Sequence, residues 1–123
     1  MLERIKGVGS MLNRSGQTNQ ETPEVDVAHT ARARSTGAAQ IVDVREPDEW
    51  ADGRIPGAVH IPLGDLPRRR GELDPTRPVI AVCRSGRRSL TAAEDLLGNG
   101  FAGAASLAGG MIAWHEAGQP VDR

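Results

Sequence analysis

The stretch VIAVCRSGRRSLTAAEDLL, residues 79–97, decides the fold of this 123-residue chain. Its apolar start, VIAV, is typical of a strand that is buried on both faces of a sheet. Residues 89–97 predict an amphipathic helix with Ser89 as its N-terminal cap. The expected apolar face of that helix consists of Leu90, Ala93, Leu96 and Leu97. A strand, a short loop and a helix in this order are the repeating unit of an α/β fold.

The same alternation continues along the chain. Further strands are predicted at residues 39–44, 58–61 and 104–107, where short apolar runs are bounded by turn residues. Further helices are predicted at residues 26–34, with Asp26 as the cap and Gly37 as the stop, and at residues 47–52, where Pro47 opens the helix. Two more are predicted at residues 67–73 and, after a turn at Gly109-Gly110, at residues 111–118. Strands that alternate with helices predict a parallel sheet covered on both faces, with the active site at the carboxyl ends of the strands. Cys83 lies at that end of the strongest strand.

Composition limits the function classes. Hydrophobic residues make up 38% and charged residues 25% of the chain, and the formal net charge is −1, as in an ordinary soluble domain. A balanced charge argues against nucleic acid or an anionic membrane as partner. No apolar run approaches the ~20 residues that span a bilayer. A single cysteine excludes an intrachain disulfide and fits a reducing compartment, so we expect a cytoplasmic protein.

Two further features shape the expected organisation. Residues 1–21 are interpreted as an N-terminal appendage, in which Leu2, Ile5, Val8 and Leu12 have loose helical spacing and residues 14–22 resemble a linker. Residues 22–123 form the expected domain. Metal and cofactor sites are not predicted, because the three histidines are scattered, Cys83 is alone and no GxGxxG motif follows a strand.

The loop from Cys83 to Arg88 carries the predicted chemistry. The positive N-terminal end of the following helix points back at the sulfur, and Gly86 allows successive amides to face one centre. Arg84, Arg87 and Arg88 add positive charge. A cysteine in such surroundings titrates at ~3.5–7.5 instead of ~8.5, so Cys83 is predicted to be a nucleophilic thiolate.

A simpler interpretation of each residue stays open at this point. A lone cysteine in an apolar run is often only a small buried hydrophobe. Each arginine taken singly is either solvated or paired with Glu94 or Asp95, and we expect one or two of the three to point away from the sulfur.

Three ordered motifs resemble the rhodanese superfamily. CRSGRRS (residues 83–89) is similar to the active-site loop of single-domain rhodaneses, and IVDVREPDEWADGRIPGAVHIPLGDL (residues 41–66) resembles the family's first signature. LAGGMIAWHEAGQPV (residues 107–121) resembles its C-terminal segment. The resemblance extends over residues 23–122. One departure is Arg54, where the family often has histidine, and we expect it to alter only the charge of the rim.

The resemblance implies a five-stranded parallel sheet flanked by helices on both faces. It implies that Cys83 takes a sulfane sulfur from a donor such as thiosulfate, holds it as a persulfide and passes it to a thiol or to cyanide. Arg84, Arg87 and Arg88 would bind the donor, and Ser85, Gly86 and Ser89 would complete the loop. Asp43 and Arg45 would lie near this loop as an outer layer, more as a structural ion pair than as catalysts.

Two rival functions remain open. Cdc25-like phosphatases and arsenate reductases resemble this fold, but their loop is Cys-x5-Arg, one residue longer than the Cys83-to-Arg88 spacing. The second rival is a sulfur-relay or partner-binding module with little thiosulfate activity, which would use the same loop toward a thioredoxin-like or sulfur-carrier protein. The run Arg68-Arg69-Arg70 and residues 1–21 are possible docking surfaces for such a partner, although a charge run is usually a solvated face.

Overall fold

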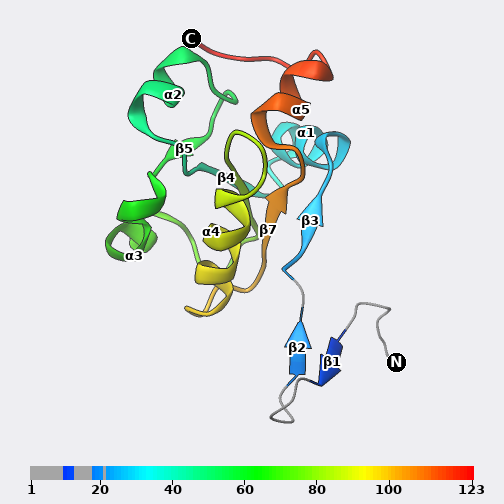
Figure 1. The fold of residues 1–123 in the computed structure, drawn as a ribbon, viewed down its shortest axis with the longest axis vertical. Helices are drawn as coiled ribbons and strands as arrows, with labels where there is room; N and C mark the ends of the chain where they lie inside the picture. The colour runs from blue at the N-terminus through cyan, green and yellow to red at the C-terminus, as the bar shows by residue number, and fades with distance from the viewer. Residues whose placement is uncertain (1–9, 13–17, 21) are drawn as a thin grey trace.

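The central feature of the protein is a five-stranded parallel sheet (Figure 1), seen in a computed structural model that describes residues 10–12, 18–20 and 22–123. The strand order is β3-β7-β6-β4-β5, and every pairing is parallel. The strands are β3 (Glu24–Val25), β4 (Gln40–Asp43), β5 (Val59–His60), β6 (Val79–Val82) and β7 (Ala104–Leu107). The predicted α/β class and sheet are confirmed. Of the five strands of this sheet, β3 was not predicted from the sequence pattern, because its two residues are not part of an apolar run.

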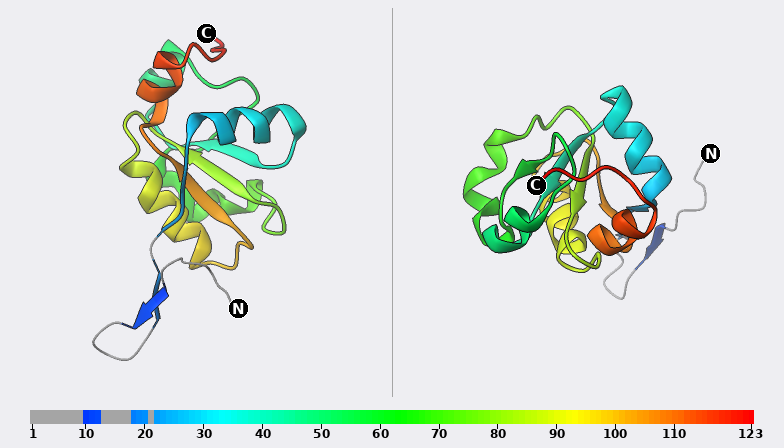
Figure 2. Two further views of the ribbon diagram at one scale, coloured as in Figure 1. Left: turned by 90° about the vertical axis from the view of Figure 1, so that its right-hand side faces the viewer. Right: turned by 90° about the horizontal axis from the view of Figure 1, so that it is seen from above.

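The described residues form five α-helices, which are α1 (Val27–Thr36), α2 (Pro47–Asp52), α3 (Leu66–Arg69), α4 (Arg88–Leu97) and α5 (Gly110–Glu116). Helices α1 and α5 pack on one face of the sheet, and α3 and α4 pack on the other (Figure 2). Alternate residues of each strand point to opposite faces, so the sheet divides the core in two. One half joins Val42 and Ala81 to Leu66 and Leu96 on the α3 and α4 side. The other joins Ile41 and Ile80 to Ala33 and Trp114 on the α1 and α5 side.

Local sequence signals set the ends of two helices as predicted. Asp26 caps α1, with its Oδ1 accepting from the His29 amide at 2.8 Å, and Gly37 ends the helix with φ of 75°. Helix α2 has Pro47 in its first turn, and Glu46 and Glu49 form a reciprocal capping box. This short helix presents Glu49 toward the site described below.

The prediction for α4 was wrong in two details. The helix begins at Arg88, with Arg87 in the cap position and no side-chain cap. Ser89 lies inside the helix and is fully buried, together with Ala92, Ala93 and Leu96. Leu97 is 38% exposed. The buried residues 89, 92, 93 and 96 have helical spacing. The buried face of α4 therefore includes Ser89 and not Leu97, which the prediction had placed on it.

Part of the predicted appendage is also described. Strands β1 (Ser10–Leu12) and β2 (Thr18–Gln20) pair antiparallel in a separate two-stranded sheet. Leu12 is therefore in a strand and not in the predicted helix, and the linker predicted at residues 14–22 contains β2. Leu2, Ile5 and Val8 lie outside the described residues. Among the described helices, none is long and apolar enough to cross a bilayer.

Candidate active site

Cys83 follows the last residue of β6 at the carboxyl edge of the sheet. Its side chain lies on the α4 side of the core, and the residue is only 1% exposed. The loop of residues 83–87 then leads into α4, as the pattern predicted. Burial alone would favour the neutral thiol, so the ionisation of Cys83 depends on the polar groups that surround its sulfur.

Three hydrogen-bond contacts converge on the Cys83 sulfur. The Gly86 amide donates to Sγ at 3.1 Å, the Ser89 amide donates at 3.4 Å, and the Ser89 hydroxyl lies 3.4 Å away. Burial raises the pKa of the thiol, but hydrogen bonds from the Ser89 hydroxyl and from the amides of Ser89, Gly86 and Ser85 outweigh it and lower that pKa below its ordinary value. The sulfur is buried, but the neighbouring amides face it and favour the thiolate.

The shape of the loop is fixed by helix α5. The Met111 amide donates to the carbonyl of Cys83 at 2.9 Å, and the Ile112 amide donates to the carbonyl of Arg84 at 3.1 Å. Because a peptide unit is planar and trans, a carbonyl that points toward α5 turns the amide of the next residue the opposite way. The amide of Ser85 is thereby directed to the side of the sulfur.

This close approach between α5 and the loop requires glycine. Gly110 has φ of 56°, and an added Cβ there would overlap the carbonyl groups of Cys83 and Arg84. Gly86 has φ of 102°, and its added Cβ would lie 3.1 Å from the Gly109 nitrogen. Sequence reasoning treated residues 109–110 only as a turn. The structure shows that this glycine pair allows the C-terminal helix to hold the loop.

Ser106 is a site neighbour that sequence reasoning missed. Its hydroxyl lies 2.7 Å from the Ser89 hydroxyl and 3.4 Å from the carbonyl of Gly86. Both serines are fully buried. One sequence signal could have indicated Ser106, since it is the only polar residue in the predicted strand AASL. In the structure it pairs in register with Ala81 of β6. A chain of hydroxyls therefore runs from β7 through α4 to the sulfur.

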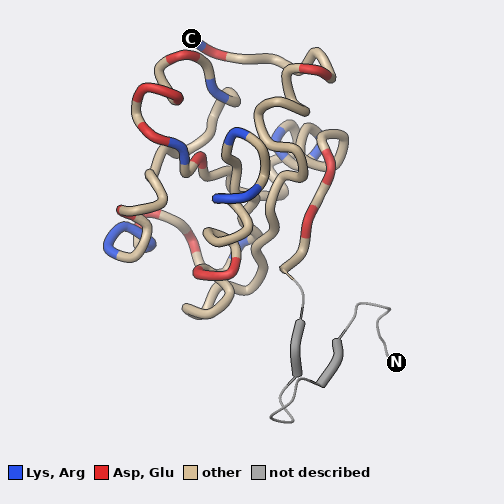
Figure 3. The backbone as a smooth tube through the Cα atoms, in the orientation of Figure 1, with Lys and Arg blue, Asp and Glu red and all other residues tan. Residues whose placement is uncertain are grey.

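The three loop arginines have different partners. Arg88 makes a bidentate ion pair with Glu49, at 2.8 and 2.9 Å. This pairing lowers the pKa of Glu49 to about 2 and raises the pKa of Arg88 further. Arg84 and Arg87 are exposed, and neither forms an ion pair within the described part of the chain. Figure 3 shows the basic loop facing the acidic segment of α2.

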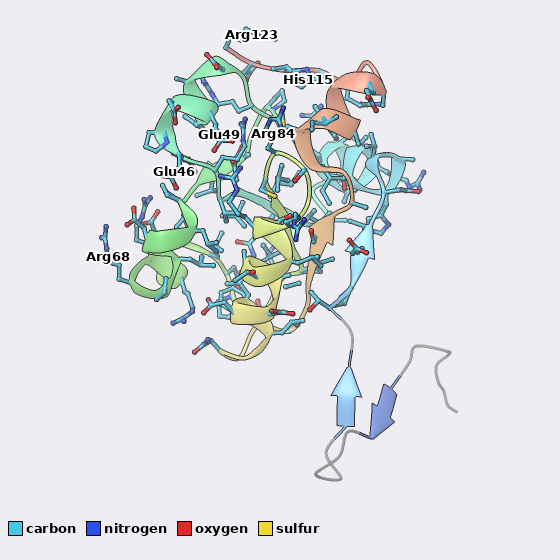
Figure 4. All side chains as sticks on the ribbon, in the orientation of Figure 1. Glu46, Glu49, Arg68, Arg84, His115 and Arg123 are labelled. Atoms are coloured by element: carbon cyan, nitrogen blue, oxygen red, sulfur yellow. The ribbon has the colours of Figure 1, made fainter. Side chains whose placement is uncertain are left out.

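The predicted alternative partners of the loop arginines are otherwise engaged. Glu94 accepts a hydrogen bond from Thr22 at 3.0 Å, and Asp95 pairs with Arg70 at 2.7 Å. Of the two alternatives left open for each arginine, the exposure of Arg84 and Arg87 agrees with the solvated one, and Arg88 pairs with Glu49 instead of Glu94 or Asp95. In Figure 4, Glu49 extends from α2 toward the loop, whereas Arg68 extends away from it.

Asp43 and Arg45 form a buried ion pair, with Arg45 Nη2 2.8 Å from Asp43 Oδ2. The guanidinium also donates to the carbonyls of Glu49 and Gly53, at 3.1 and 2.7 Å. Within the described residues, these bonds fasten α2 to the end of β4, and none of them reaches the sulfur. The pair therefore has the geometry of a structural support.

His60 lies on the edge strand β5 and has a hydrogen-bond partner. Its Nε2 is 2.8 Å from the carbonyl of Arg45. Its ring stacks on Trp50 with the ring centroids 4.6 Å apart, and the guanidinium of Arg54 lies 5.0 Å from the centroid of the Trp50 ring. His60 is thus a satisfied edge histidine. A shallow groove of about 440 Å³ runs beside the loop. Its lining residues are Leu63, Arg87, Arg88, Leu90, Thr91 and Glu94.

The described residues include no cluster of three histidine, cysteine, aspartate or glutamate side chains that would hold a metal ion. The site consists instead of one sulfur, several amides, two hydroxyls and three guanidinium groups. Such a set stabilises an anionic sulfur by dipoles and attracts anions to its mouth.

Comparison with known proteins identifies the family. Residues 27–117 match the rhodanese-like domain family. A sulfurtransferase of Allochromatium vinosum is 39% identical over 90 residues, which cover 73% of this chain and 84% of the relative. A Bacillus subtilis protein named as a candidate sulfur carrier, YrkF, is 36% identical over 101 residues, covering 81% of this chain and 55% of the relative.

A solved structure agrees with these matches. The crystal structure of a thiosulfate sulfurtransferase from Pseudomonas aeruginosa superimposes with a TM-score of 0.74 at 34% identity. The superposition covers 83% of this chain and 20% of that protein. The sequence motifs, the five-stranded parallel sheet and these relatives agree, and the chain belongs to the rhodanese-like domain family of sulfurtransferases.

Proposed function

We propose that this protein transfers sulfane sulfur through a persulfide on Cys83. In the first step the Cys83 thiolate attacks the outer sulfur of thiosulfate. A new S–S bond forms to Cys83, the S–S bond of thiosulfate breaks, and its electron pair leaves with sulfite. In the second step an acceptor thiolate or cyanide attacks the outer sulfur of the persulfide, and Cys83 leaves as the thiolate.

The observation that supports this proposal best is the set of donors around Sγ. The Gly86 amide, the Ser89 amide and the Ser89 hydroxyl lie within 3.4 Å of the sulfur. Fixed dipoles of this kind favour the anionic nucleophile before attack and the anionic leaving thiolate after transfer. They need no rearrangement between the two steps, which suits a group that is both nucleophile and leaving group.

The exposed arginines suit the donor. Arg84 and Arg87 are solvent-exposed at the mouth of the loop, and thiosulfate brings a charged oxyanion with the sulfur to be transferred. Guanidinium groups bind such oxyanions through a planar fork of donors. Arg88 is already bound by Glu49, so we assign donor binding first to Arg84 and Arg87, and an orienting role to Arg88.

A relay function is the second candidate, and the similarity to the candidate sulfur carrier YrkF favours it. In this case a protein persulfide would donate the sulfur, and a thioredoxin-like or carrier protein would accept it. The chemistry at Cys83 is the same. The two candidates differ in which donor loads the sulfur and in which acceptor removes it.

Intact-mass spectrometry tests both candidates. The protein is incubated with thiosulfate and, separately, with a persulfide donor. We expect one added sulfur atom in the wild type and none in Cys83→Ala or Cys83→Ser. Loading by the persulfide donor alone would support the relay. Loading by neither donor, or loading of the Cys83 variants, would overturn the proposal.

A further inference from the structure

A buried chain of two serine hydroxyls leads from strand β7 to the nucleophile. Ser106 on β7 lies 2.7 Å from Ser89 on α4, and Ser89 lies 3.4 Å from the Cys83 sulfur. Both serines are 0% exposed. We propose that Ser106 is a positioning residue, which holds the Ser89 hydroxyl proton on the Cys83 sulfur; its importance for turnover rests on the proposed use of Cys83 as nucleophile.

The direction of each hydrogen bond depends on the protons that the two serine hydroxyls and the Cys83 sulfur carry. A serine hydroxyl has one proton to donate and two lone pairs. When Cys83 is a thiolate, Ser89 donates to the sulfur, and its oxygen is then free to accept from Ser106. When Cys83 is a thiol, both hydrogen bonds of Ser89 reverse: the thiol donates to Ser89, and Ser89 donates to Ser106. The proton of Ser106 is then directed to the carbonyl of Gly86.

One distance favours the thiolate arrangement. Both arrangements use the short bond between the two serines, at 2.7 Å. Only the thiol arrangement relies on the contact from Ser106 to the Gly86 carbonyl, which is long, at 3.4 Å. Hydrogen bonds in a chain strengthen one another in a dry interior, so Ser106 makes Ser89 a better donor to an anionic sulfur.

The charged groups around the sulfur do not replace this effect. From α4, Arg88 faces the site but is held by Glu49 of α2. In the loop itself, Arg84 and Arg87 are exposed. On the strand beside β7, Glu24 pairs in register with Ser106 and is also exposed. Among these groups none contacts either buried hydroxyl.

The direct test is the pKa of Cys83, measured from the pH dependence of iodoacetamide alkylation. We expect Ser106→Ala to raise this pKa by about half to one unit, which lowers the alkylation rate ~3- to 10-fold at a pH below the pKa. Ser106→Thr keeps the hydroxyl in the strand and should retain the wild-type pKa. A matched control is Thr30→Val, which removes another fully buried hydroxyl, on the other face of the sheet.

A double-mutant cycle tests whether Ser106 acts through Ser89. In the Ser89→Ala background, Ser106→Ala should add no further change in the Cys83 pKa. Additive shifts would overturn the proposal, and so would a wild-type pKa in Ser106→Ala or a raised pKa in Ser106→Thr. Alkylation does not depend on sulfur transfer. A raised pKa without persulfide formation would therefore refute the proposed function alone, and persulfide formation with an unchanged pKa would refute the role of Ser106 alone.

Discussion

Two buried acidic groups lie at the ends of neighbouring strands, Asp43 on β4 and Cys83 after β6, and they are stabilised in different ways. Asp43 is 1% exposed and is paired with the guanidinium of Arg45 at 2.8 Å. Cys83 is equally buried, but its contacts are amides and a hydroxyl. One negative charge is neutralised by a cation in direct contact, and the other is stabilised mainly by the dipoles of amides and a hydroxyl.

The difference explains why one group is a support and the other is suited to reaction. A carboxylate in a bidentate ion pair has its lone pairs engaged, and breaking the pair leaves a buried charge. A thiolate held by amides keeps a lone pair available toward the mouth of the loop. The fixed partial charges of amides lower its pKa without forming an ion pair that an incoming donor would have to break.

The largest expected effect is the loss of stability when the Asp43–Arg45 ion pair is broken. Asp43→Asn leaves the buried Arg45 without a counter-ion and should lower the free energy of unfolding by about 3–5 kcal/mol, measured by urea denaturation. The alkylation pKa of Cys83 should change little. Asp65→Asn, which removes the exposed partner of Arg68, is the matched control and should leave stability nearly unchanged. A large pKa shift at Cys83 with unchanged stability would contradict the distinction between the sites.

The second prediction concerns a substitution that should displace the loop amides from the Cys83 sulfur. Gly110→Ala introduces a Cβ that overlaps the carbonyls of Cys83 and Arg84, so we expect a loss of about 2–3 kcal/mol and slower alkylation of Cys83. Gly118→Ala separates the two causes, since Gly118 also has positive φ, 71°, but has nothing within 4 Å of an added Cβ. It should cost about 1 kcal/mol and leave alkylation unchanged. Equal alkylation in both variants would show that α5 does not position the loop.

The third prediction compares two basic residues. Arg88→Ala removes the partner of Glu49 and leaves a carboxylate beside the loop, where it repels an anionic donor. Thiosulfate turnover should fall about tenfold, or about 1.4 kcal/mol in the transition-state free energy. Arg68→Ala removes a side chain that is 72% exposed and should have almost no effect. Similar turnover in the two variants would exclude a special role for the loop charge.

The smallest expected effect is the loss of stability when Glu49 is protonated. Glu49 contacts both the Asp43–Arg45 pair and the Cys83 loop. Its carbonyl accepts from Arg45, and its carboxylate pairs with Arg88. Because the pKa of Glu49 is lowered from 4.5 to about 2 in the folded protein, its stabilisation is complete above pH 4.5 and is lost as the pH falls toward 2. We expect about 1 kcal/mol, since Arg88 is one-third exposed and solvent screens the pair. Urea denaturation in this range should show a steeper loss of stability for wild type than for Glu49→Gln.

The sequence was informative where a signal is local. The strand at residues 104–107, the cap at Asp26 and the short helix opened by Pro47 were all predicted, because each depends on residues within one or two turns. Cys83 was found because it combines a strand end, a glycine and clustered arginines within six residues. These signals are independent of the rest of the chain.

The remaining features depend on contacts between distant segments. Ser106 reaches the sulfur only through Ser89, which is 17 residues away in the chain, and the pairing of Arg88 with Glu49 joins residues 39 apart. No single-sequence pattern encodes such partners. The prediction from the sequence also gave the three arginine charges too large a part in the ionisation of Cys83. In the folded protein, hydroxyl and amide hydrogen bonds lower the thiol pKa, while one of the three guanidinium groups is neutralised.

The low accessibility of Cys83 also limits which reagents it can meet. A sulfur atom on a residue that is 1% exposed admits only partners that present their reactive atom end-on, at the tip of a narrow group. Thiosulfate, cyanide and an extended cysteine arm have this shape, whereas bulky oxidants and branched electrophiles do not. The same burial that raises the free-energy cost of ionisation should therefore also select the reagents that reach the sulfur by their shape.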